Sequence, residues 1–326
     1  MRLSVLAFLV CLQAHAEPLP ALGADASNVT VSGVSSGGYM AVQLHVAHSA
    51  TVSGVGVVAG GPYYCAQGSL WTAYHNCRTP GAWSPLPAVA LLGAVVQALA
   101  RAGRIDPPDN LRGARVWLFT GRQDRTVYPE VVHALRRFYE ANRAKPVLVA
   151  HLPAGHGMVT AEAGGACSST GSPFINDCDY DAAGELLKHL FGALEPASQP
   201  AGRLVRFDQT PFGEMYALSM DDEGFVYLPK ACEAARCRIH VALHGCRQNA
   251  RAVGERFVRD AGYNRWAESN RLIVLYPQTI ARLFGVFNPR GCWDWWGYTG
   301  ADYHTRRAPQ IRAIKAMLDK LGSEPD

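Results

Sequence analysis

The chain has 326 residues, of which 48% are hydrophobic and 18% are charged. This composition excludes an intrinsically disordered chain and allows a sizeable buried core. The formal net charge is only +4 and the basic residues are scattered along the chain, which argues against nucleic acid as a partner.

The N-terminal segment has the features of a secretory signal peptide. Arg2 supplies the positive charge, residues 3–12 form a short apolar run, and residues 14–16 (Ala-His-Ala) are a cleavage site of the small-residue kind. The apolar run is too short for a membrane span, which needs about 20 residues. We therefore expect removal of residues 1–16 and a secreted protein, extracellular or periplasmic, that does not associate with a membrane.

The mature chain keeps an even number of cysteines, which predicts a disulfide framework in an exported protein. Counting does not fix the connectivity, because eight cysteines allow too many pairings. Pairing nearest neighbours along the chain joins Cys65–Cys77, Cys167–Cys178 and Cys232–Cys237 and leaves Cys246–Cys292. A zinc site is the competing interpretation, but the sequence has no C-x-x-C pair.

In the first part of the chain, apolar strands alternate with helical patterns, which predicts a parallel α/β sheet. The predicted strands are 28–33, 52–59, 115–120 and 146–151, and the predicted helices are 37–48, 87–104, 131–142 and 181–191.

Residues 195–202 have the composition of a loop or linker, and shorter elements follow them. The predicted strands are 203–207, 224–228, 238–243 and 271–276, and the predicted helices are 254–270 and 303–321. A domain boundary near residue 200 is one interpretation. The other is that both parts of the chain build one sheet.

A candidate nucleophile lies at the end of the strand at 28–33. The sequence Gly-Val-Ser-Ser-Gly over residues 33–37 is the G-x-S-x-G pattern between a strand and a helix, as a nucleophile elbow requires. We choose Ser35 over Ser32 and Ser36 because Ser35 has glycines two residues away on both sides. An ordinary glycine- and serine-rich turn is the alternative.

Two further strand ends carry the partners that such a serine needs. Asp124 follows the strand at 115–120, and His156, between two glycines, follows the strand at 146–151. Carboxyl ends of parallel strands share one edge of a sheet, and the chain order Ser, Asp, His is that of α/β-hydrolases. We predict Ser35 as nucleophile, His156 as base and Asp124 as orienting acid. The alternatives are a helix cap or turn for Asp124 and a surface loop for His156.

The oxyanion of the reaction needs two donors. One is the amide of Ser36, and the other usually comes from a His-Gly loop that precedes the serine. Here that pattern, His244-Gly245-Cys246, follows the late strand at 238–243. We therefore predict an α/β-hydrolase fold with a mostly parallel central sheet and helices on both faces. It would be circularly permuted and form one domain over residues 17–326. An incidental turn in a second domain is the alternative.

These motifs together resemble the extracellular poly(3-hydroxybutyrate) depolymerases of the circularly permuted, single-domain type. The resemblance rests on residues 33–38, the loops of Asp124 and His156, residues 243–246 and residues 292–296 (Cys-Trp-Asp-Trp-Trp). Many bacterial members carry a separate C-terminal polymer-binding domain, which we do not expect here.

The resemblance implies the triad above, an oxyanion hole made by the amides of Ser36 and Cys246, and a disulfide between Cys246 and Cys292. It implies hydrolysis of a polyester or its oligomers through an acyl-enzyme, and we expect a monomer that needs no metal or organic cofactor. Feruloyl and acetyl esterases of plant polysaccharides share parts of the pattern, and a small-ester carboxylesterase is the alternative. A non-catalytic polymer-binding protein on a degenerate hydrolase scaffold is an alternative of another class.

An aromatic group next to Cys292 is the candidate wall of the substrate site. Its members are Trp293, Trp295, Trp296 and Tyr298. We add His244 from the His244-Gly245-Cys246 turn, which we call the oxyanion turn. Ordinary core packing is the alternative, because tryptophans are mostly buried.

Overall fold

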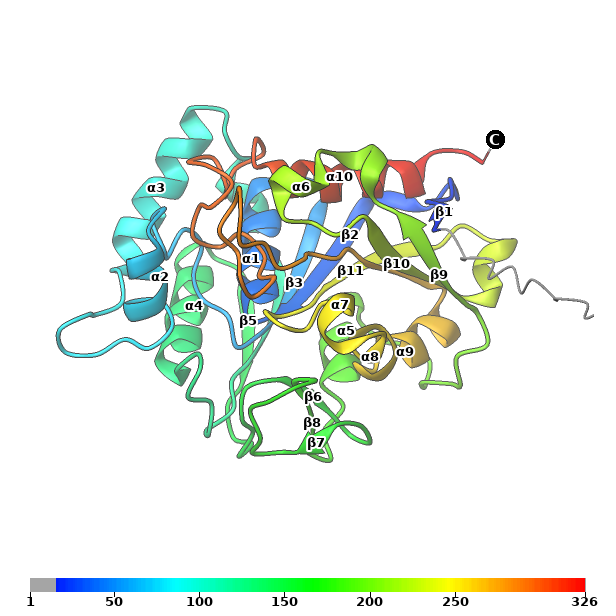
Figure 1. The fold of residues 1–326 in the computed structure, drawn as a ribbon, viewed down its shortest axis with the longest axis horizontal. Helices are drawn as coiled ribbons and strands as arrows, with labels where there is room; N and C mark the ends of the chain where they lie inside the picture. The colour runs from blue at the N-terminus through cyan, green and yellow to red at the C-terminus, as the bar shows by residue number, and fades with distance from the viewer. Residues whose placement is uncertain (1–15, 326) are drawn as a thin grey trace, which may run out of the picture.

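The computed structural model describes residues 16–325, so residues 1–15 of the predicted signal peptide lie outside the described residues. Its centre is a nine-stranded sheet in the order β1-β9-β10-β12-β11-β2-β3-β4-β5 (Figure 1). The strands are β1 (Glu17–Pro18), β2 (Asp25–Val34), β3 (Val52–Val58), β4 (Arg115–Phe119), β5 (Lys145–Val149), β9 (Arg203–Asp208), β10 (Glu223–Leu228), β11 (Arg238–Leu243) and β12 (Leu272–Tyr276).

The sheet is mostly parallel and draws on both halves of the chain. From β12 to β5 every neighbouring pair is parallel, and only β10 runs against its two neighbours. The halves meet where β11 pairs with β2, with His240 opposite Thr30 and Leu243 opposite Gly33. Strand 238–243 therefore ends beside the predicted nucleophile elbow, as the sequence predicts.

Helices cover both faces of the sheet, which confirms the predicted fold class. They are α1 (Ser36–Ala47), α2 (Leu70–His75), α3 (Val89–Arg101), α4 (Pro129–Ala141), α5 (Ala182–Phe191), α6 (Met215–Leu218), α7 (Ala250–Val253), α8 (Arg256–Asp260), α9 (Tyr263–Asn270) and α10 (Pro309–Gly322).

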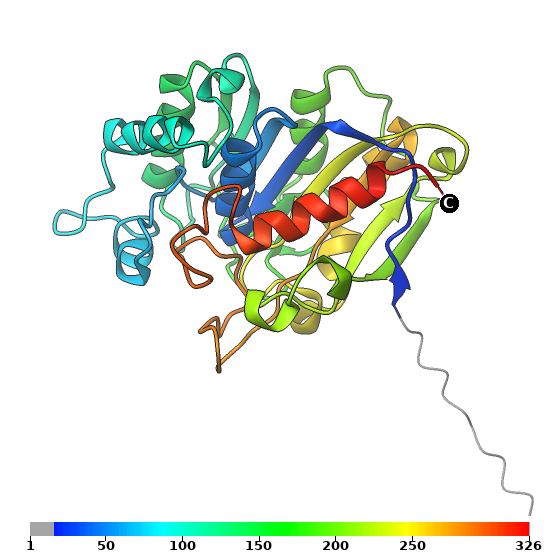
Figure 2. The ribbon, with the colours of Figure 1, turned by 90° about the horizontal axis from the view of Figure 1, so that it is seen from above.

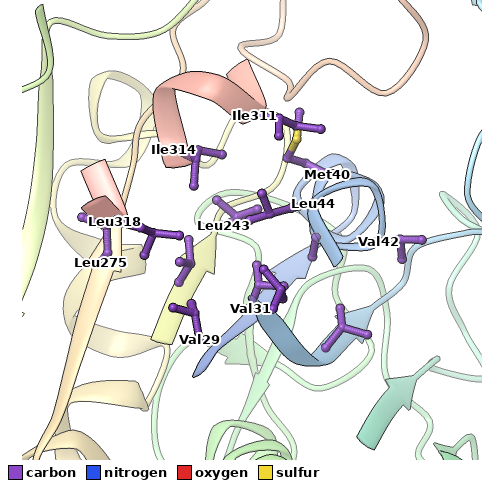
Figure 3. Packing of buried hydrophobic residues seen from close by; sticks show 14 of the residues in the cluster. Val29, Val31, Met40, Val42, Leu44, Leu243, Leu275, Ile311, Ile314 and Leu318 are labelled. Carbon is purple, nitrogen blue, oxygen red and sulfur yellow. The ribbon is translucent and has the colours of Figure 1, made fainter. Parts of the chain in front are cut away.

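Each face of the sheet has its own hydrophobic cluster, because successive side chains of a strand point to opposite sides. On one face Val31 of β2 belongs to a cluster with Leu44 of α1 and Ile314 of α10 (Figure 3). On the other face Phe119 of β4 belongs to a cluster with Leu186 of α5. The central strands are buried on both sides, as is usual for parallel strands.

The segment between β1 and β2 lies beside the C-terminal end of α10 (Figure 2). The amides of Leu22 and Ala24 donate to the carbonyl of Leu321 at 3.2 and 3.0 Å, and Gly23 donates to Ser323 at 2.8 Å. The last helix thus ends against the segment that enters β2, and the C-terminal strands take up positions next to the strand that carries the elbow.

Several elements differ from the sequence prediction. The helix predicted over 254–270 is broken into α8 and α9 at Gly262, whose φ of 93° is left-handed. The last helix begins at Pro309 rather than 303, because proline is favoured in the first helical turn. The sequence analysis did not predict α2 or a small second sheet made of β6 (Met158–Thr160), β8 (Ile175–Asp177) and β7 (Gly165–Ala166).

The structure pairs the eight cysteines of residues 16–325 as nearest neighbours plus one long-range bridge. The disulfides are Cys65–Cys77, Cys167–Cys178, Cys232–Cys237 and Cys246–Cys292. Within residues 16–325, no helix has the length and apolar character that crossing a bilayer would require.

Candidate active site

Ser35 lies in a strained turn between β2 and α1. Its φ of 56° and ψ of −119° are outside the regions that non-glycine residues favour. A Cβ atom on Gly33 would lie 2.2 Å from the backbone of Gly37, so strand and helix pass too closely for a side chain there. The glycines of the motif therefore permit the turn, and the serine side chain is 9% exposed.

The elbow packs directly against the turn that follows β11. A Cβ atom on Gly37 would lie 2.4 Å from the carbonyl oxygens of both Leu243 and His244. A Cβ atom on Gly245 would lie 3.5 Å from the Cβ of Ser35. The backbone of the elbow and the backbone of the turn after β11 are thus in contact, although they are far apart in the sequence. The register between β2 and β11 sets their alignment.

Asp124 and His156 form a buried, hydrogen-bonded pair. His156 Nδ1 lies 2.8 Å from Asp124 Oδ2, and the side chains are 7% and 1% exposed. The other carboxylate oxygen accepts from the amides of Thr126 and Val127 at 2.8 and 2.9 Å. These charge-assisted bonds orient the carboxylate, and they leave Nε2 as the ring nitrogen available for a reaction.

The loop that carries His156 is held by a neighbouring loop. The amide of His156 donates to Thr170 Oγ1 at 2.9 Å. The buried side chain of Gln248 then links this neighbour to the oxyanion turn. Its oxygen accepts from the amide of Gly245 at 2.8 Å, and its Nε2 donates to the carbonyl of Phe174 at 2.9 Å. Sequence analysis did not single out Gln248, because a glutamine three residues after a His-Gly pair has no motif of its own.

The predicted triad and oxyanion residues line one cavity of about 550 Å³, with Asp124 buried behind His156. Its lining includes Ser35, Ser36, His156 and Cys246 together with Tyr39, Tyr74, Arg78, Arg247, Arg290 and Trp295. Ser36 is the first residue of α1, so its amide has no acceptor within the helix. The structure thus brings the amide-bearing residues Ser36 and Cys246 to the cavity that also contains Ser35.

A disulfide fixes the aromatic segment beside this cavity. Cys246 of the oxyanion turn is bonded to Cys292, and the amide of Trp293 donates to Ser36 Oγ at 3.3 Å. Trp295 lines the cavity and stacks on Tyr39, with ring centroids 4.4 Å apart. The disulfide and this hydrogen bond therefore tie the aromatic segment to the oxyanion turn and to the start of α1.

A second cavity, of about 430 Å³, adjoins the first and shares Tyr74 and Arg290 with it. Trp296 lines this second cavity rather than the first. The other residues that contribute to its mostly apolar lining are Leu70, Trp71, His75, Phe287, Asn288, Pro289 and Cys292.

Three of the residues predicted to bind substrate are placed elsewhere, and this corrects the sequence prediction. His244 is fully buried: its Nδ1–H donates to the carbonyl of Gly245 at 2.8 Å, and its Nε2 accepts from the amide of Thr279 at 3.1 Å. Burial lowers the pKa of His244 to about 4. Trp293 is fully buried against His244, and the Tyr298 hydroxyl donates to the carbonyl of Cys292 at 2.7 Å. These side chains therefore shape the turn and line neither cavity.

Other residues of the site were missed by the sequence analysis. Tyr39 could have been found, because it lies one helical turn after Ser35. Tyr74 belongs to the short helix α2 and Arg78 to the loop after it. This region has no motif, and nothing in the sequence connects it to the elbow. Within residues 16–325, no group of three or more His, Cys, Asp or Glu side chains is arranged to hold a metal ion.

The parallel sheet and the elbow define an α/β-hydrolase-type fold. No family model matches the sequence. The chain is 44% identical over 314 residues to a poly(3-hydroxybutyrate) depolymerase of Delftia acidovorans, covering 94% of this chain and 62% of that relative's length. It is 37% identical over 348 residues to a polyhydroxybutyrate depolymerase of Talaromyces funiculosus, covering 98% and 97%.

Solved structures give the same result. The crystal structure of a PHB depolymerase from Penicillium funiculosum matches with a TM-score of 0.84 and 35% identity, covering 94% of this chain and 100% of that one. A serine-to-alanine variant of a PHB depolymerase, complexed with an R3HB trimer, matches equally well. The chain therefore belongs to the poly(3-hydroxybutyrate) depolymerase family of carboxylic ester hydrolases, which confirms the resemblance noted in the sequence.

Proposed function

We propose that the protein hydrolyses ester bonds of poly(3-hydroxybutyrate) or its oligomers with Ser35 as nucleophile. The observation that carries this proposal is the Asp124–His156 pair at the cavity that contains the strained Ser35. The names of the relatives and the R3HB trimer in a similar structure supply the substrate class. The chain spans 62% of the length of the Delftia relative. The polyester substrate is therefore proposed for this chain and not taken over from that relative.

In the proposed reaction, Ser35 Oγ attacks the ester carbonyl while His156 Nε2 accepts the hydroxyl proton. Asp124 keeps the proton on Nδ1 and stabilises the imidazolium. The amides of Ser36 and Cys246 donate to the oxyanion, and such a donor typically contributes roughly 2.7–4 kcal/mol to lowering the barrier. The intermediate expels the alcohol, which takes the proton from His156. Water, deprotonated by His156, then attacks the acyl-serine and releases the acid.

Replacing the nucleophile tests the chemistry. In Ser35→Ala we expect kcat on a soluble butyrate ester to fall by roughly 10⁴-fold or more, with loss of covalent labelling by an organophosphate. The matched control is Ser53→Ala, which changes an exposed serine on β3. This variant should keep both the ester turnover and the organophosphate labelling of the parent. Parent-like turnover by Ser35→Ala would refute the assignment.

A comparison of substrates tests the polyester. We expect the protein to clear a turbid poly(3-hydroxybutyrate) suspension and to release oligomers and 3-hydroxybutyrate. Feruloyl and acetyl esters of plant polysaccharides should be turned over much more slowly. Faster hydrolysis of those esters, with no clearing of the suspension, would replace the polyester with a small-ester substrate while leaving the triad in place.

We also propose that the protein is exported, because four disulfides form and persist in an oxidising compartment. Expression of the full chain should yield a product in the periplasm or medium whose N-terminal sequence starts at Glu17. A product that keeps Met1 and stays in the cytoplasm would contradict both the export and the cleavage site.

A further inference from the structure

The cavity that contains Ser35 has an unusual charge for a site that acts on a neutral ester. Three arginines, Arg78, Arg247 and Arg290, belong to its lining, and within residues 16–325 no Asp or Glu side chain lines it. Asp124, behind His156, is already bonded to the imidazole and to two backbone amides. We infer that these arginines form a carboxylate subsite, so that the enzyme recognises the free acid end of an oligoester. This inference rests on the proposed esterase function.

Arg78 is the residue on which the inference depends most. It is half-buried, and its guanidinium carbon lies 4.5 Å from the centre of the Tyr74 ring. Its Nε is buried and has no hydrogen-bond partner in the described chain. A guanidinium over the face of a ring still has N–H groups free for an acceptor in its own plane, and a carboxylate can accept two such bonds.

The carboxylate partners of some other arginines provide a contrast with Arg78. Outside the cavity, Arg251 pairs with Asp221 at 2.8 Å and Arg306 pairs with Asp106 at 2.9 Å. None of the ion pairs within residues 16–325 includes Arg78. Its cation is therefore available to an acid that enters the cavity.

Arg247 and Arg290 supply charge on the oxyanion side of the cavity. Arg247 follows the proposed oxyanion donor Cys246, and its amide donates to the carbonyl of Arg290 at 2.7 Å. Both side chains are exposed. Arg290 also lines the neighbouring apolar cavity, so the cationic region continues into a space lined by groups such as Trp71 and Phe287. An oligoester has a charged end and an apolar chain, and the two cavities together match that pattern.

The chemistry of a 3-hydroxyacid oligomer places its carboxylate near the scissile bond. At the acid end, the last ester oxygen is separated from the carboxylate by one CH and one CH₂ group. The ester carbonyl on Ser35 and the carboxylate must therefore occupy the same cavity. At an internal bond of the polymer this position is a neutral ester, which accepts weaker hydrogen bonds than a carboxylate does. The arginines should thus favour the ester bond next to the free acid.

Paired substrates test the inference. We expect the parent enzyme to have a kcat/KM for the 3-hydroxybutyrate dimer acid about tenfold or more above that for its methyl ester. In Arg78→Gln this acid-to-ester ratio should fall about tenfold, because the charged partner is lost. Arg78→Lys keeps the charge without the fork and should keep part of the ratio. Arg307→Gln, an exposed arginine outside both cavities, is the control and should leave the ratio unchanged.

A second measurement needs no variant. Raising NaCl from about 0.05 to about 0.5 M should lower the parent's acid-to-ester ratio, because salt screens the partly exposed arginines. Equal turnover of acid and methyl ester, or an equal loss on both in Arg78→Gln, would overturn the subsite while leaving the esterase function intact. Hydrolysis of neither substrate by the parent enzyme would overturn the proposed function together with the subsite.

Discussion

Two parts of the molecule meet at the active-site cavity and are built in opposite ways. The elbow with its oxyanion turn is buried, and its parts touch through backbone atoms that leave no room for a Cβ at Gly33 or Gly37. The apolar rim of the second cavity, made of Leu70, Trp71 and Phe287, is 43%, 70% and 59% exposed. The first part therefore leaves the backbone little room to move, whereas the second presents exposed side chains to solvent. Substitutions in the two parts should therefore differ in their effects on stability and on activity.

The largest effect is expected where the backbones touch. In Gly37→Ala the new methyl group would lie 2.4 Å from two carbonyl oxygens, so strand β11 or helix α1 must shift. We expect severe destabilisation, and any folded fraction should lose activity by roughly 10²-fold or more, because both proposed oxyanion donors, the amides of Ser36 and Cys246, would move. Urea unfolding and ester turnover measure the two effects.

The matched control is Gly93→Ala in α3, where nothing lies within 4 Å of the added methyl group. There the substitution should stabilise the protein by about 0.5–1 kcal/mol, because alanine is the better helix former. Equal unfolding midpoints for the two variants would show that the close approach at the elbow has no energetic consequence.

Acid should weaken the elbow region before it affects the rim, because buried neutral histidines lie beneath it. Burial lowers the pKa of His240 to about 3 and that of His244 to about 4, below their usual value of about 6.5. At a pH between about 4 and about 6.5, these histidines are therefore protonated in the unfolded chain and neutral in the folded chain. The stabilisation is fully present above about pH 6.5 and is lost as the pH falls towards 4.

At pH 5 each of these histidines should lower the free energy of unfolding by about 2 kcal/mol relative to pH 7.5. Urea unfolding at the two pH values measures the loss. A free energy of unfolding that stays constant between them would mean that these imidazoles are not buried in the folded protein.

The bridge between the oxyanion turn and the loop of His156 should give a smaller effect. Gln248→Ala leaves the amide of Gly245 without its acceptor and removes one of two donors to the carbonyl of Phe174, which keeps its bond from the amide of Met158. We expect a loss of about 1–2 kcal/mol in stability and about tenfold in kcat, with little change in KM. Gln97→Ala, an exposed glutamine of α3, should change neither quantity. A raised KM with unchanged kcat would argue that Gln248 contacts substrate instead.

The contrast also explains what the sequence reveals. Ser35, Asp124 and His156 could be predicted because each follows a strand, and the ends of parallel strands share one edge of a sheet. The pairing of β11 with β2 could be predicted because a His-Gly turn can supply an oxyanion donor only if it lies beside the nucleophile elbow.

The rest of the site depends on packing that no local pattern encodes. His244 and Trp293 carry the side chains expected at a substrate wall, yet both are fully buried, and hydrogen bonds hold the His244 ring in place. Tyr74 and Arg78 reach the cavity from a region near the Cys65–Cys77 disulfide that has no motif. A residue of a short helix, such as Tyr74, and a loop residue, such as Arg78, are found only when the fold brings them together.

The smallest effect on folding is expected at the rim. Trp71→Ala removes a side chain that is 70% exposed, so the Tm should change by no more than about 2 °C. Turnover of a short soluble ester should stay within about twofold of the parent, because Trp71 does not line the cavity of Ser35. Turnover of suspended polymer should fall several-fold, because a long apolar chain would lose contact area in the second cavity.

Trp117→Ala provides the opposite case for this comparison, since that tryptophan is 2% exposed on β4. Its loss should cost about 3–5 kcal/mol of stability and reduce turnover of both substrates together through unfolding. If Trp71→Ala instead lowered soluble-ester and polymer turnover equally, the rim would act on the catalytic centre itself. The buried elbow region and the exposed rim would then not act independently at Trp71.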